Sequence, residues 1–279
     1  MVNISLPHPS GEPYSWIEHF AKICGGLEWR KVLLSAFTCY FDASGSETDQ
    51  PCLAVAGFVA LADQWLQFES EWNATLSRFH LPYFRVSEIN QDPRFKNDPA
   101  LLKALYIDLI QIIKDNVLRQ FGCGIFSTTM KLMTDKEREE WKISMYGIAG
   151  RACAGQVRIW CTQETIPILP ELIFEHGDFG SDSLRLLLVQ DGFQEPLFRR
   201  KKDFIRADGF LERGVIPLQA ADLLAFECFD PIRKIANDGH LKRLRPSGIA
   251  LEEIRGEPTY ISDATWMPDG PDDKPIRGI

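Results

Sequence analysis

Four acidic residues stand in sequence contexts where carboxylates could act together on a metal ion. Asp42 follows the apolar run FTCYF, Glu175 ends the run LIF, Asp222 interrupts the apolar segment QAADLLA, and Glu88 lies in YFRVSEIN. Burial of an unpaired charge is costly, so such a carboxylate usually has a basic partner, a proton or a metal ion. Hard cations such as Mg²⁺ and Mn²⁺ prefer oxygen ligands, and a pair of them about 3.5–4 Å apart can hydrolyse a phosphodiester. The sequence therefore predicts a catalytic metal site made of Asp42, Glu88, Glu175 and Asp222.

Each of these acids also has a simpler interpretation. Asp42 precedes Ser44-Gly45 and can shape a turn, and Asp222 can pair with a basic residue. Glu175 can end a strand at the surface, and Glu88 can be a solvated loop acid. Only their convergence in space separates the metal site from these alternatives.

Further residues are candidates for holding a substrate. Gln219 precedes Asp222 by about one helical turn, so we expect it to orient a ligand or a substrate group. Ser44 follows Asp42 closely, and the basic run Arg199, Arg200, Lys201 and Lys202 can hold the phosphates of a nucleic acid, although such runs are often solvated surface. His176 can act as an acid, a base or a metal ligand, or be a loop histidine with no special role.

The elements that position these residues follow from periodicity and turn signals. Alternating β-prone runs predict strands over 36–45 and 52–61 joined as a hairpin, and apolar spacing predicts a helix over 65–79. Further along the chain we expect helices over 98–117, 136–160 and 182–194, strands over 121–129 and 171–178, a short β-prone stretch over 202–207, and a last core helix from Pro217. A hairpin followed by alternating helices and strands predicts an α/β mixed sheet with flanking helices.

Two of these motifs resemble a known family. FDASG at 41–45 and PLQAADLLA at 217–225 are similar to the opening and late motifs of the domain-of-unknown-function family 3800. The resemblance covers about residues 36–236 and implies a ribonuclease H-like fold, with Asp42, Glu175 and Asp222 as metal ligands and Glu88 at the mid-chain acidic position. The chain departs from the family at Ala43, where an acid is common, and at Val86-Ser87, where a His-Ala-like pair is typical.

Composition limits the kinds of binding, cysteine chemistry and cellular location that we expect. The net charge of −8 argues against nucleic-acid binding by the whole surface but not against a carboxylate metal site. The seven cysteines include no CxxC pair, so we expect reduced, buried thiols. The chain also lacks a secretory signal and a membrane-length apolar run, which predicts a cytoplasmic protein.

The expected domain is 36–240, with an N-terminal extension over 1–35 and a C-terminal extension over 241–279. The leading hypothesis is a nuclease that depends on Mg²⁺ or Mn²⁺ and acts on DNA or RNA. By analogy alone, its biological role could be in mobile-element or antiphage defence. The alternative is a non-catalytic ribonuclease H-like module that binds nucleic acid or a protein partner. A protein partner or a homo-oligomer fits either hypothesis, with the extensions as docking segments.

Overall fold

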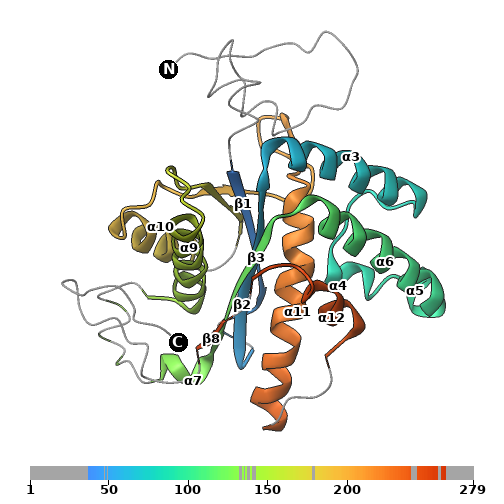
Figure 1. The fold of residues 1–279 in the computed structure, drawn as a ribbon. Coiled ribbons are helices and arrows are strands. Elements are labelled where there is room, and N and C mark those ends of the chain that lie inside the picture. Colours follow the sequence, from blue (N-terminus) through green and yellow to red (C-terminus); the bar gives the residue numbers. More distant parts are fainter. Residues whose placement is uncertain are drawn as a thin grey trace, which may run out of the picture.

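A six-stranded mixed sheet forms the centre of the protein, and helices cover both of its faces (Figure 1). The computed structural model describes residues 37–46, 48, 50–131, 134, 136, 139, 143–177, 180–239, 244–256 and 259–261. The strands of this sheet are β1 (Phe37–Gly45), β2 (Cys52–Leu61), β3 (Arg119–Phe126), β4 (Glu171–Glu175), β5 (Leu197–Arg199) and β8 (Thr259–Ile261). They lie side by side in the order β5-β4-β1-β2-β3-β8.

The direction of the strands divides the sheet into two parts. β1 and β2 pair antiparallel, as the hairpin predicted from the sequence requires, and β3 pairs antiparallel with β2 to complete a meander. β4 runs parallel to β1, and β5 runs parallel to β4, so the carboxyl ends of β1, β4 and β5 meet at one edge of the sheet. Ligand sites of open α/β sheets form at such an edge.

The helices connect the strands and fill the two outer layers. They are α3 (Ala62–Arg78), α4 (Val86–Ile89), α5 (Pro93–Asn97), α6 (Pro99–Asn116), α7 (Ser127–Met130), α9 (Met145–Gln163), α10 (Ser181–Gln190), α11 (Pro217–Asp238) and α12 (Pro246–Leu251). A separate small hairpin pairs β6 (Phe204–Ile205) with β7 (Leu211–Glu212), between β5 and α11. No helix in the described part of the chain is long and apolar enough to cross a membrane.

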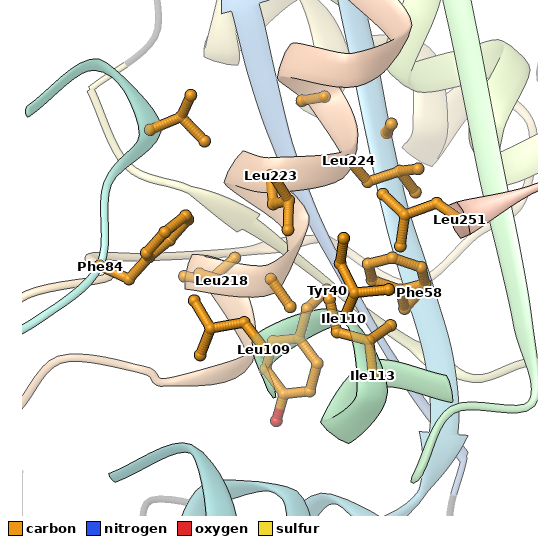
Figure 2. Close-up of a cluster of buried hydrophobic side chains, with 14 of the residues drawn as sticks. Tyr40, Phe58, Phe84, Leu109, Ile110, Ile113, Leu218, Leu223, Leu224 and Leu251 are labelled. Carbon is orange, nitrogen blue, oxygen red and sulfur yellow. The ribbon is translucent and has the colours of Figure 1, made fainter. Parts of the chain in front are cut away.

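One face of the sheet packs against α11, which lies along β1 and β2, with α3, α6 and α12 outside it. Figure 2 shows how Tyr40 and Phe58 from the sheet meet leucines of α11 and the Leu109–Ile113 side of α6. Every second residue of a strand faces the same side. The alternation that directs Tyr40 toward α11 therefore directs Asp42 toward α11 as well.

The opposite face packs against α9 and α10. Cys39 and Phe41 of β1 lie in this second core, together with Phe174 of β4 and Leu184 of α10. The six cysteines within the described residues are free and buried, as predicted, while Cys24 lies outside them.

Three expectations from the sequence need correction. The helix predicted over 136–160 is interrupted: Lys136 and Glu139 are helical, Ile143 and Ser144 are not, and α9 begins at Met145. Ser144 has extended backbone, and its side chain caps α9 by accepting from the backbone N–H of Gly147 at 2.9 Å. Most of 131–142 lies outside the described residues. Glu88 lies in the short helix α4 rather than in a loop.

The third correction concerns the boundary predicted at residue 240. Leu251 and Ile254 are buried in the core beside α11, and β8 extends the sheet next to β3. This part of the predicted C-terminal extension therefore belongs to the domain, because its apolar side chains complete the core. The predicted N-terminal extension lies outside the described residues.

A buried carboxylate–lysine site

Asp42 lies inside strand β1 and not in the turn that follows it. It pairs with Ala56 of β2 and is only 2% exposed, and Oδ1 accepts the backbone N–H of Ala43 at 2.7 Å. The turn begins three residues later, at Gly45, whose φ of +98° favours glycine. A Cβ atom there would also stand 2.6 Å from the carbonyl oxygen of Cys52. The glycine of the FDASG motif thus serves the turn, and the aspartate serves the face of the sheet.

Asp222 reaches the same place from the second turn of α11. Its Oδ2 accepts the backbone N–H of Val86 at 2.7 Å, which ties α11 to the first residue of α4. Pro217 suits the first position of this helix, because its missing N–H needs no partner there. The helix therefore starts five residues before Asp222 and presents the carboxylate toward β1.

Lys201 joins the two aspartates. Its ammonium group donates to Oδ2 of Asp42 and, at 2.7 Å, to Oδ1 of Asp222. The lysine is only 5% exposed. Burial alone would lower the pKa of this ammonium, but the nearby carboxylates of Asp42, Asp222 and Glu175 together raise it above its ordinary value. Lys201 is therefore a charged, buried cation at neutral pH.

Glu175 stands next to Asp42 at the carboxyl end of the neighbouring strand. The register pairs Phe41 with Phe174, so Glu175 faces the same side of the sheet as Asp42. Arg199, which pairs with Glu175 across β4 and β5, adds a second positive charge on this face. Burial raises the pKa of Glu171, at the other end of β4, to about 7, although Arg199 acts in the opposite direction.

Gln219 fixes the backbone around the site. Its Oε1 accepts from Nε1 of Trp72 at 2.9 Å and from the backbone N–H of Phe84 at 2.8 Å, while Nε2 donates to the carbonyl oxygen of Lys201 at 2.9 Å. The side chain is buried, with 1% exposure. The sequence predicted a contact with substrate, but these hydrogen bonds make Gln219 a positioning residue that connects α3, α11 and the chain at Lys201.

The structure does not bring Glu88 into the group. Its carboxylate accepts a hydrogen bond from the Tyr83 hydroxyl and lies 3.6 Å from Arg85 and 4.0 Å from Lys202, with 46% of the side chain exposed. Burial and this hydrogen bond raise the pKa of Tyr83 to about 12. Glu88 therefore lies on the exposed rim, close to the chain segment that carries Lys201.

The basic run divides between the interior and the surface. Lys201, predicted to hold phosphates, is instead buried between the aspartates, and Arg199 is half-buried beside Glu175. Lys202 is exposed, and the half-buried guanidinium of Arg200 lies 4.4 Å from the centre of the Phe204 ring. Ser44 is half-buried on the α11 side of β1, two residues beyond Asp42.

Sequence reasoning missed Lys201 as the partner of both aspartates. A basic partner for Asp222 was one of the open alternatives, but nothing in the run RRKK distinguishes one lysine from its neighbours. His176 is exposed after β4.

No three carboxylate, histidine or cysteine side chains within the described residues are grouped closely enough to hold a metal ion. Comparison with protein-family models, curated proteins and solved structures found no match for the chain. The case for a function therefore depends on the geometry of these side chains.

Proposed function

We propose that this chain is a divalent-metal-dependent phosphodiester hydrolase, a nuclease, built on a ribonuclease H-like core. The strand order supports the choice of core. An antiparallel meander β1-β2-β3, continued from β1 through the parallel strands β4 and β5, is the arrangement typical of ribonuclease H-like proteins. Asp42 within β1, Glu175 at the end of β4 and Asp222 on α11 also occupy the kinds of element on which the family resemblance implies metal ligands.

The observation that carries the proposal is the convergence of Asp42 and Asp222 on a single cation. The two residues come from opposite ends of the domain, and both are largely buried. Two carboxylates are brought together only at a considerable cost in desolvation and repulsion. A fold that needed stability alone would do as well with apolar side chains at these positions, so their juxtaposition favours a functional role.

The donor set is suited to a hard divalent ion in chemistry and in charge. Carboxylate oxygens are the ligands that Mg²⁺ and Mn²⁺ prefer. The site already stabilises one positive charge between Asp42 and Asp222, with the Glu175 carboxylate close enough to act on the same charge. A metal ion would take the place of the Lys201 ammonium, whose side chain must then turn away while its backbone stays bound to Gln219.

Asp42, Asp222 and Glu175 would hold the ion in this proposal. A bound ion would supply an activated water molecule and stabilise the charge that develops on the phosphate. Gln219 keeps the chain at Lys201 and α11 in register, and the backbone N–H of Val86 fixes the direction of Asp222. Arg200 and Lys202, next to Lys201 in the chain, would hold phosphates of the substrate.

Calorimetric titration with Mn²⁺, in the presence and absence of a single-stranded oligonucleotide, tests the proposal. We expect the wild type to bind the ion and Asp42→Asn and Asp222→Asn to lose this binding together with nucleic-acid cleavage. Asp230→Asn is the matched control, because Asp230 is also a buried, ion-paired aspartate of α11 but lies two turns away, about 12 Å along the helix. Equal metal binding by all four proteins, or none by the wild type in either condition, would contradict the proposal.

One observation favours a second candidate, a non-catalytic module that binds nucleic acid or protein. The Lys201 ammonium already donates hydrogen bonds to both aspartates, and Ala43 stands where the family that the chain resembles commonly has an acid. For such a module, the wild type would bind a partner but no Mn²⁺. The same titration therefore separates the two candidates.

A further inference from the structure

The β6–β7 hairpin projects an unusual surface directly after the buried lysine. The backbone N–H of Val215 donates to the carbonyl oxygen of Arg200 at 2.8 Å and closes the base of the hairpin. At its tip, the backbone N–H of Arg206 donates to the carbonyl oxygen of Phe210 at 2.9 Å. Only four residues belong to its two strands, and neither strand pairs with the main sheet. A two-stranded hairpin of this kind is marginally stable by itself.

Large apolar side chains on this hairpin face water. Phe204 is 40% exposed, Phe210 63%, Ile205 68% and Leu211 41%. The register pairs Phe204 with Glu212 and Ile205 with Leu211, so the two aliphatic residues share one face and Phe204 lies on the other. The hydrogen bond from Arg206 to Phe210 continues this pairing by one residue beyond the strands, and the alternation then puts Phe210 on the face of Phe204. Exposed apolar groups gathered on a small element indicate an interaction site.

The face that carries the phenylalanines also carries cations. The guanidinium of Arg200 lies 4.4 Å from the centre of the Phe204 ring, and that of Arg206, which also pairs with Asp208, lies 5.9 Å from the Phe210 ring. Next to the base of the hairpin, the ammonium of Lys202 lies 5.3 Å from the Tyr83 ring. Residues 199–214 contain six basic and three acidic side chains, in a chain whose net charge is −8.

We propose that this face of the hairpin, formed by Phe204, Phe210, Arg200 and Arg206, binds single-stranded nucleic acid and leads it to the carboxylate site. Exposed aromatic rings beside cations are the means by which proteins bind unpaired strands, because bases stack on the rings while the cations contact phosphates. In a duplex the bases already stack on one another, so the rings would gain nothing from it. The part of this inference that leads the strand to the carboxylate site rests on the proposed function. The chain passes from Lys201 in that site to Phe204 of the hairpin within three residues, so the two lie close together.

The opposite face of the same hairpin provides a matched control. Fluorescence anisotropy of a labelled deoxythymidine homopolymer and of a labelled uridine homopolymer would be measured with the full-length chain in EDTA, where a metal-dependent site cannot cleave. We expect Phe204→Ala combined with Phe210→Ala to weaken binding at least about tenfold, since stacking contributes about 1–3 kcal/mol per base. Ile205→Ala combined with Leu211→Ala should change the affinity less than about twofold. Arg200→Gln should lower the slope of the logarithm of affinity against the logarithm of salt concentration by about 0.7, the value for one contact with a single strand.

Several outcomes would overturn this inference. They are equal losses for the two double variants, tighter binding of duplex than of single strand, and absence of binding by the wild type. A fourth outcome combines two results. The chain would self-associate in analytical ultracentrifugation, and only the Ile205→Ala and Leu211→Ala double variant would abolish this, while the phenylalanine double variant would leave the affinity for nucleic acid unchanged. The hairpin would then be a protein contact. The result also stands apart from the proposed function, because strand binding in EDTA without metal-dependent cleavage would reject the nuclease and retain the hairpin as the binding surface.

Discussion

The most informative perturbation is the replacement of Lys201 by Met, an unbranched side chain that is one heavy atom shorter and has no charge. The Lys201 ammonium is the cation that Asp42 and Asp222 share. Its removal leaves both carboxylates buried without that cation. Loss of one partner from a buried ion pair costs about 3–5 kcal/mol, and here the lost partner serves two carboxylates.

The expected loss of stability translates into a large change in melting temperature. For a domain of this size, 1 kcal/mol corresponds to about 2–4 °C, so Lys201→Met should melt roughly 10 °C below the wild type in EDTA. Lys202→Met is the matched control, because the side chain of Lys202 is 48% exposed and stands 4.0 Å from its nearest carboxylate, that of Glu88. An exposed pair contributes little, so this variant should melt within about 2 °C of the wild type.

The same variant tests whether a metal ion and Lys201 compete. A ligand that binds only the folded state stabilises it by about 2.7 kcal/mol at 100 times its dissociation constant. Because an ion must displace Lys201 in the wild type, Mn²⁺ should raise the melting temperature of Lys201→Met more than that of the wild type. The raised pKa of Lys201 keeps its ammonium charged at neutral pH, where the melts would be made.

The reasoning would be refuted if Lys201→Met and the Lys202→Met control had the same melting temperature in EDTA, since the buried cation would then contribute nothing to stability. Equal stabilisation of the wild type and Lys201→Met by Mn²⁺ would leave the ion pair intact as a structural feature and refute the competition.

Three further predictions concern the surroundings of the site. Burial raises the pKa of Glu171 from 4.5 to about 7, so between these pH values the folded state binds more protons than the unfolded state. The free energy of unfolding should therefore fall as the pH rises from about 4.5 to about 7. Glu171→Gln should remove this fall and raise the free energy of unfolding at pH 8 by up to about 3 kcal/mol, as measured by denaturant titration. Gln219→Met should lower the free energy of unfolding by about 2–5 kcal/mol, because it leaves two buried N–H donors and a carbonyl without their partners. Gly45→Ala should lower the free energy of unfolding by about 1–3 kcal/mol, because Gly45 has a positive φ and its new methyl group would contact the carbonyl oxygen of Cys52. Gly155→Ala in α9 should raise it by about 0.5–1 kcal/mol, because the new methyl group meets nothing within 4 Å.

Each of these has an outcome that would contradict it. Parallel stability curves of Glu171→Gln and the wild type from pH 4 to pH 8 would show that the raised pKa has no energetic consequence. For Gln219, the exposed Gln111 of α6 supplies the control, and equal effects of Gln219→Met and Gln111→Met would show that the buried hydrogen bonds are replaced by other partners. For the glycines, equal changes at Gly45 and Gly155 would contradict the conformational argument.

The sequence by itself determined most of the elements of the fold. Local periodicity and caps are properties of neighbouring residues, which is why the hairpin of β1 and β2 and the helix that begins at Pro99 after the capping side chain of Asp98 were predictable. The start of α9 was missed because no Gly or Pro precedes the cap at Ser144 to mark a break in the helical stretch. The role of α12 and β8 was missed because composition says little about where a short segment docks.

The types of residue in the site were also evident in the sequence, since Asp42, Glu175 and Asp222 interrupt apolar runs. Their arrangement was decided only by the tertiary structure. The parallel register of β1 and β4 places Asp42 and Glu175 on one face, and the packing of α11 across that face adds Asp222. Lys201, and not a basic neighbour, lies between the aspartates because the chain between β5 and β6 turns this side chain inward. The backbone there is held by a hydrogen bond from Gln219, 18 residues further along the chain, and no local sequence pattern contains such a contact.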